Sequence, residues 1–62
     1  MKFSDMIGQV FKMTDLLKHE VVLARVLDVS DEGGMLLQMA AAPYEGQLRF
    51  RPHYLVALDP QS

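Results

Sequence analysis

The chain has 62 residues, a formal net charge of −2 at pH 7, half of its residues hydrophobic and no cysteine. A chain of this length forms one small domain, residues 1–62, which buries only about 60% of the surface that its unfolded form exposes. The lack of cysteine excludes disulfides and cysteine-ligated zinc. The negative charge argues against a general nucleic-acid binder, whose affinity rests on neutralising phosphates.

The N-terminal segment gives no sign of a membrane anchor or a secretion signal. No apolar run reaches the roughly 18 residues that a membrane helix needs. Asp5 interrupts the segment in which a signal peptide has an unbroken apolar core. We therefore expect a cytoplasmic protein with no membrane contact.

The first eighteen residues fit two structures. At 100° per residue, Phe3, Met6, Ile7, Val10, Met13 and Leu17 share one face, which is typical of an amphipathic helix that begins at Ser4. Against the helix, Gly8 would cost about 1 kcal/mol in its middle. The alternative is a strand over residues 8–13 followed by a long loop. The hydrophobic pattern alone favours the helix.

The middle of the chain predicts a hairpin. Two apolar runs, "EVVLARVLDV" at 20–29 and "MLLQMAA" at 35–41, flank the polar cluster "SDEGG" at 30–34. A loop of this kind between two such runs is typical of paired antiparallel strands. A second turn, "APYEG" at 42–46, follows the second run.

The last segment predicts a strand and a closing turn. In "QLRFR", 47–51, Leu48 and Phe50 share one face and the arginines share the other, which we expect to face solvent. Pro52 cannot donate to a sheet and favours the first position of a helical turn. We therefore expect one 3₁₀ turn over "PHYL", directing Leu55 inward, before a last short strand.

Several of these stretches resemble a known family. "IGQVFKM", "ARVLDVSDEGG", "MLLQMA" and "LRFRPHYL" resemble SH3-like small barrels of the Tudor-like kind, as in the C-terminal domain of ProQ-type RNA chaperones. The matching positions are Gly8, Gln9, Val26, Leu27, Gly34, Arg51 and Leu55. The resemblance implies a mainly β fold, a small antiparallel barrel with a 3₁₀ turn before the last strand. The alternative is an α+β fold, with an N-terminal helix packed on a three-stranded sheet.

A second resemblance is to the carbon storage regulator family of small RNA-binding dimers. "HEVVLARVLDV" and "AAPYEGQLRFR" are similar to its central strands and its arginine-bearing strand end. This resemblance implies that Arg51 contacts RNA. The basic pair expected near the start of that family is replaced here by Ser4, Asp5 and Met6.

Two groups of residues are candidate binding sites. Arg49, Arg51, His53 and Tyr54 could bind nucleic acid, because guanidinium groups hold phosphates and aromatic rings stack on unpaired bases. The second group consists of apolar residues that could form an interface between protein chains: Val22, Ala24, Val26, Met35, Leu37 and Met39. A strand that is apolar on both faces, as residues 21–27 are, is buried on both. The alternative for the second group is that it fills the core.

No pattern in the sequence indicates catalysis. No serine or threonine lies in a recognisable nucleophile motif, and the two histidines lack the spacing of a metal site. We therefore expect a non-enzymatic binding or regulatory module without metal or cofactor, which forms a homo-oligomer and binds a protein partner. The alternative function is RNA binding through Arg49 and Arg51. A third candidate is an enzyme whose pore forms only in an oligomer.

Overall fold

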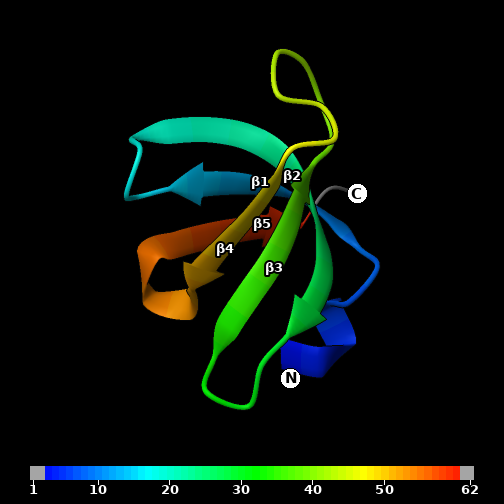
Figure 1. The fold of residues 1–62 in the computed structure, drawn as a ribbon, viewed down its shortest axis with the longest axis vertical. Helices are drawn as coiled ribbons and strands as arrows, with labels where there is room; N and C mark the ends of the chain where they lie inside the picture. Colours follow the sequence, from blue (N-terminus) through cyan, green and yellow to red (C-terminus); the bar gives the residue numbers. More distant parts are fainter. Residues whose placement is uncertain (1–2, 61–62) are drawn as a thin grey trace.

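The computed structural model describes residues 3–60, which form five antiparallel strands in a single sheet (Figure 1). The elements are η1 (Phe3–Met6), β1 (Val10–Asp15), β2 (Glu20–Val29), β3 (Gly34–Met39), β4 (Leu48–Pro52), η2 (His53–Leu55) and β5 (Val56–Pro60), where η marks a 3₁₀ helix. The order across the sheet is β4-β3-β2-β1-β5. Neither helix within residues 3–60 is long and apolar enough to cross a membrane.

The mainly β class and the 3₁₀ turn before the last strand are confirmed. The sheet is not closed into a barrel, because β4 and β5 lie at its opposite edges and do not pair (Figure 1). The alternative with an N-terminal amphipathic helix is wrong. Val10–Asp15 is a strand that pairs with β2 on one side and β5 on the other. Gly8 has φ 88°, which no α-helical residue adopts.

Strand β2 gives the sheet its curvature. Its first half pairs with β1 and its second half with β3. The register with β3 shifts between Val26 and Asp28. An extra residue at such a bulge bends the strand and increases its twist. The sheet therefore wraps around one inner face, which carries the core (Figure 1).

The predicted hairpin over 30–34 is confirmed, and its geometry explains the glycine pair. The Ser30 hydroxyl accepts a hydrogen bond from the Gly34 N–H at 2.9 Å, and the Ser30 carbonyl accepts one from the Gly33 N–H at 3.0 Å. Gly33 has φ 87°, a conformation that side chains rarely adopt. The turn joins β2 and β3 in antiparallel register.

The core consists of inward side chains from β1, β2 and β3. Its members are at most 5% exposed: Phe11, Met13, Ala24, Val26, Met35, Leu37 and Met39. Five of the six residues predicted as a possible interface belong to this list, and the sixth, Val22, is half-buried and packs against it. The domain itself buries the five core side chains, whereas it covers Val22 only in part.

Strand β4 is where the structure departs most from expectation. Its alternation was predicted correctly, but its two faces are exchanged. Arg49 points inward and is only 5% exposed, whereas Leu48 and Phe50 are 57% and 59% exposed. Arg51, also inward, is half-buried. The predicted solvent-facing arginines are therefore inside, and the predicted core residues of this strand are outside.

Candidate interaction surface at strand β4

Asp15 is the reason that the two arginines turn inward. This residue ends β1 with its side chain on the core face, and it is fully buried. Its carboxylate accepts hydrogen bonds from Arg49 Nη1 at 3.0 Å and from Arg51 Nε at 3.1 Å. A buried carboxylate is costly unless it is paired. The two arginines supply that pairing from a strand that does not adjoin β1.

The same carboxylate also holds the β1–β2 turn. Asp15 Oδ1 accepts hydrogen bonds from the backbone N–H groups of Leu17 and Lys18 at 3.0 and 3.2 Å. His19, at φ 56°, completes this turn in the left-handed region. One side chain thus stabilises a local turn and a contact between distant parts of the chain.

Further groups surround the Arg49 guanidinium. Glu20 Oε1 lies 3.1 Å from Nη1, and the Gln47 side-chain oxygen accepts a hydrogen bond from Nε at 2.9 Å. The Tyr44 ring centroid lies 5.0 Å from the guanidinium carbon, in cation–π contact. Among the described residues, Arg49 Nη2 is the only buried side-chain nitrogen or oxygen without a hydrogen-bond partner. The Tyr44 ring provides part of the missing stabilisation.

The pKa values of two groups reflect this arrangement. Burial raises the pKa of Asp15, but the hydrogen bond and charge of Arg51 and the N–H groups of the turn outweigh it, so the pKa lies below its usual range. The hydrogen bond to Glu20, together with the charge of that residue, raises the pKa of Tyr44. Asp15 is therefore held ionised as the acceptor in this cluster.

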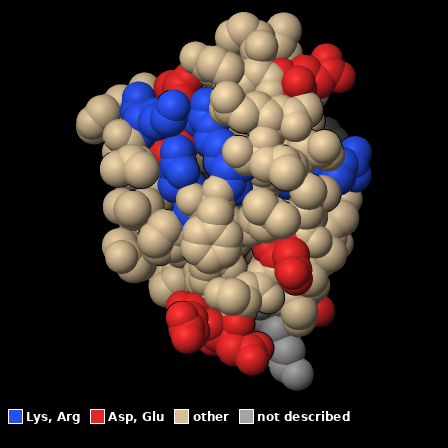
Figure 2. Space-filling model, in the orientation of Figure 1, with Lys and Arg blue, Asp and Glu red and all other residues tan. Residues whose placement is uncertain are grey.

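The predicted nucleic-acid residues do not form one surface. Arg49 and Arg51 are engaged with Asp15 inside the domain, while His53 and Tyr54 lie exposed on η2, with their rings edge to face at 5.8 Å. The two guanidinium groups face two carboxylates, those of Asp15 and Glu20, so the cluster has no net charge. Figure 2 shows most of the Lys and Arg atoms on this side gathered beside β4 and the β1–β2 hairpin, with acidic atoms among and around them, and a separate basic group at the right of the view.

The other face of β4 carries an apolar patch. We define the outer patch as Leu36, Leu48 and Phe50; Leu36 lies directly opposite Phe50 in the β3–β4 register. The Phe50 ring lies over Gly34, where an added Cβ would come within 2.3 Å of its Cζ atom. Gly34 thus lets the ring lie against the backbone, a known way to cover a glycine in a sheet. More than half of the Leu48 and Phe50 surfaces remains exposed.

The backbone of β4 is free along the same edge. Two backbone hydrogen bonds show which peptide groups face β3. The Gln47 carbonyl accepts one from the Met39 N–H, and the His53 N–H donates one to the Gly33 carbonyl, both at 2.8 Å. Because peptide groups alternate in direction along a strand, those of Arg49 and Arg51 also face β3. Those of Leu48 and Phe50 face away, and no strand within residues 3–60 pairs with them. One of these groups has a partner: Phe50 O accepts from Arg51 Nη1 at 2.9 Å.

The opposite edge, on β5, is less open to pairing. Leu16 N donates to Leu55 O, so the peptide groups of Val56, Leu58 and Pro60 face away from β1 by the same alternation. The Val56 N–H is already bonded to His53 O, and proline has no N–H. Only Leu58 keeps a free N–H and carbonyl. Strand β4 is therefore the better edge for adding a strand.

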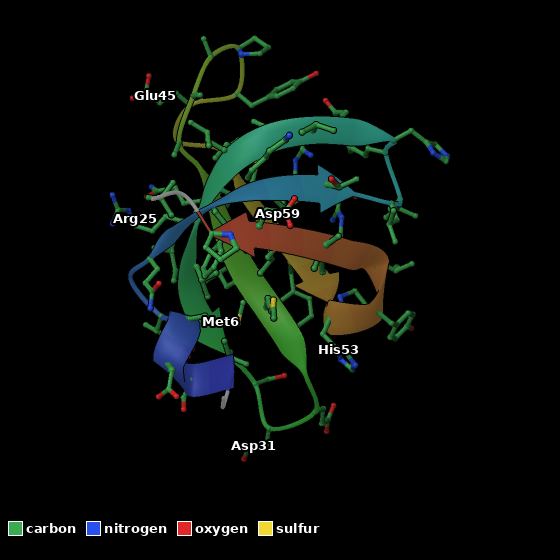
Figure 3. All side chains as sticks on the ribbon, turned by 180° about the vertical axis from the view of Figure 1, so that it is seen from behind. Met6, Arg25, Asp31, Glu45, His53 and Asp59 are labelled. Carbon is green, nitrogen blue, oxygen red and sulfur yellow. The ribbon has the colours of Figure 1, made fainter. Side chains whose placement is uncertain are left out.

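A small pocket opens at the other end of the core. It has a volume of about 180 Å³ and is lined by Met6, Met35, His53, Val56 and Leu58. In Figure 3, the labelled Met6 and His53 lie on the two 3₁₀ helices, on either side of β3. The volume is below the range of about 300 to 1,000 Å³ that is typical of small-molecule sites. Within residues 3–60, no cluster of three or more His, Asp or Glu side chains could hold a metal ion.

Sequence reasoning missed Asp15 and the exposure of the outer patch. A signal for Asp15 was present: with β1 as a strand, Asp15 falls on the same face as Phe11 and Met13. An acid on an apolar face needs a buried cation. The two arginines of β4 were candidates, and that choice would have turned Leu48 and Phe50 outward.

Comparison of the chain with protein-family models, with curated proteins and with solved structures finds no match. The resemblance to Tudor-like barrels therefore stays a prediction. The function must be argued from the geometry of the domain itself.

Proposed function

We propose that this chain is a small, non-enzymatic protein-binding module that accepts an extended strand of another chain along the edge of β4. The observation that carries the proposal is the exchanged orientation of β4. The strand presents outward peptide groups and two large exposed apolar side chains, Leu48 and Phe50, at one edge. Strand addition uses these two elements, main-chain hydrogen bonds for affinity and alternate side chains for specificity. A cytoplasmic location, expected from the sequence, is part of the proposal.

The distribution of charge supports this function. Proteins that avoid association protect their edge strands with charged side chains, including inward-pointing ones, and with prolines or bulges. Strand β4 has Pro52 at its end, and its charged residues, Arg49 and Arg51, point inward, but Asp15 neutralises them there, so they place no unpaired charge at the edge. Its apolar residues are left at the surface, where apolar patches mark interaction sites. RNA binding has less support, since the arginines on which it depended are engaged with Asp15.

The first test is a peptide titration followed by NMR. The probe is a short capped peptide with leucine and phenylalanine at alternate positions, added to ¹⁵N-labelled protein. We expect the amide signals of Leu48 and Phe50 to shift and their hydrogen exchange to slow. Shifts confined to other strands, or none at millimolar peptide, would overturn the proposal.

Two variants make the test specific. Leu48→Pro removes an N–H that faces away from β3, so it leaves the β3–β4 ladder intact while blocking an added strand. The control is Val21→Lys, which changes a side chain that is 60% exposed but lies on β2 and not on β4. We expect Leu48→Pro to abolish peptide binding and Val21→Lys to retain it. Circular dichroism checks that both variants are folded.

A further inference from the structure

We infer that the strand added to β4 is β4 of a second copy of this chain, in an antiparallel pair related by a two-fold axis. This inference rests on the proposed function and names its partner. Its starting point is the edge itself, which carries outward peptide groups at Leu48 and Phe50 and inward ones at Arg49 and Arg51.

Only one register pairs the outward peptide groups of both Leu48 and Phe50 in both copies. It places Leu48 opposite Phe50 of the second copy, and Phe50 opposite Leu48 of the second copy, with the axis at Arg49. Each opposed pair exchanges two hydrogen bonds, which gives four for the dimer. Shifting the register by two residues sets Phe50 against Gly46 or sets Leu48 against Pro52, which has no N–H.

The side chains are complementary in this register. On the outer face, Leu48 of each copy lies directly opposite Phe50 of the other copy. Directly opposed apolar pairs of this kind stabilise a sheet. Leu36 of each copy extends the strip, because it lies opposite Phe50 within its own sheet. The outer patches of two copies then form one continuous apolar surface across the new ladder.

The inner face explains the role of the acidic residues. The axis brings the two Arg49 residues opposite each other in a pair without mutual hydrogen bonds, where backbones approach most closely. Like charges in such positions repel. Here each guanidinium is already neutralised within its own domain, at 3.0 Å from Asp15 and 3.1 Å from Glu20. The hydrogen bond from Arg51 to Phe50 O also persists, since a carbonyl oxygen accepts two.

The alternative assembly, β4 of one copy against β5 of the next, fits less well. The side chains of β5 on the outer face are Ala57 and Asp59, because Val56 and Leu58 face the core. Phe50 would then lie beside a small residue or a carboxylate. The β5 edge also offers only the peptide group of Leu58 with both its N–H and carbonyl free, so the isologous β4 pair is favoured.

Sedimentation over a range of concentrations tests the association. We expect wild type to dimerise reversibly, and Leu48→Pro and Phe50→Lys to raise the dissociation constant by about tenfold or more, because each dimer carries the change twice. Val21→Lys is the matched control and should dimerise like wild type. Phe50→Lys serves as the second variant if Leu48→Pro does not fold.

Cross-linking tests the register. The natural chain has no cysteine, so Leu48→Cys and Phe50→Cys each introduce a single thiol. Mixing the two variants under mild oxidation should give mainly the mixed disulfide, because residue 48 faces residue 50 of the other copy. A predominance of either homodisulfide would overturn the register.

The outcomes separate this inference from the proposed function. If the protein stays monomeric at millimolar concentration but binds the apolar peptide at β4, the inference of a β4–β4 dimer is wrong, and the proposed function of strand addition stands. A dimer unaffected by both variants, together with no peptide binding, overturns both. A dimer lost in both variants supports both.

Discussion

Replacing Asp15 with alanine should remove a large part of the stability of this domain. The carboxylate is fully buried and accepts hydrogen bonds from two backbone N–H groups and from two arginines. Its loss leaves the Arg49 side chain, 4% exposed, with Glu20 as its remaining carboxylate. Removing one partner of a buried ion pair costs about 3 to 5 kcal/mol. At about 0.05 to 0.15 kcal/mol per residue, a domain of this length has a total of about 3 to 9 kcal/mol.

The measurement is urea unfolding at pH 7, followed by circular dichroism. Asp15→Asn keeps an oxygen that can accept hydrogen bonds from the turn. Its free energy of unfolding should therefore lie between those of wild type and Asp15→Ala. Asp59→Ala, at an exposed carboxylate, should change the free energy of unfolding by less than about 0.5 kcal/mol. A cost below about 1 kcal/mol for Asp15→Ala, the range of surface salt bridges, would refute the reasoning.

The same residue sets a dependence on pH. Its folded-state pKa is below the usual range, so the unfolded state binds the proton more tightly. The stabilisation is complete above the unfolded pKa of about 3.9 and is lost as the pH falls through the folded pKa. Below about pH 4, the free energy of unfolding should therefore decline more steeply for wild type than for Asp15→Asn. Parallel declines for the two proteins would show that Asp15 does not titrate with folding.

Two further predictions concern other parts of the structure. Gly33→Ala and Gly8→Ala both place a side chain at positive φ, 87° and 88°, but only at Gly33 would the new Cβ lie within 2.4 Å of the His53 ring. Gly8→Ala should lower the free energy of unfolding by about 1 kcal/mol, and Gly33→Ala should lower it by more. Equal losses for the two variants in urea unfolding would contradict the steric argument. The hydrogen bond to Glu20 raises the pKa of Tyr44, so Glu20→Gln should lower the midpoint of the Tyr44 ionisation in a spectrophotometric titration. An unchanged midpoint would count against the hydrogen bond.

Strand β4 shows what the sequence could predict and what it could not. The alternation over residues 47–51 predicted a strand, and Pro52 predicted its end, because both depend on neighbouring residues. Which face points inward depends on a partner 34 residues away, Asp15, with which Arg49 forms its ion pair. Hydrophobicity alone places leucine and phenylalanine in the core. It does not take into account that a buried carboxylate elsewhere in the chain can draw the arginines inward instead.

The N-terminal segment shows a different limit. Its apolar residues fit a helical period, and no local pattern predicted that Val10–Asp15 would pair with strands on both sides. Tertiary pairing outweighed the local pattern, and the helical interpretation also hid the position of Asp15 on the inward face. The hairpin over 30–34, by contrast, was predictable because its turn residues act locally.

The double attachment of Asp15 has a consequence for the kinetics of folding. Its bonds to the turn join residues two and three positions apart, whereas its bonds to Arg49 and Arg51 close loops of 34 and 36 residues. Local contacts form early. Contacts that close long loops form late, because the chain loses the entropy of loop closure before these contacts can offset it. We therefore expect the turn to form early in folding, and the loss of the ion pairs to speed unfolding more than it slows folding. We therefore expect the charged cluster, which joins the β1–β2 hairpin to strand β4, to form last in folding and to break first in unfolding.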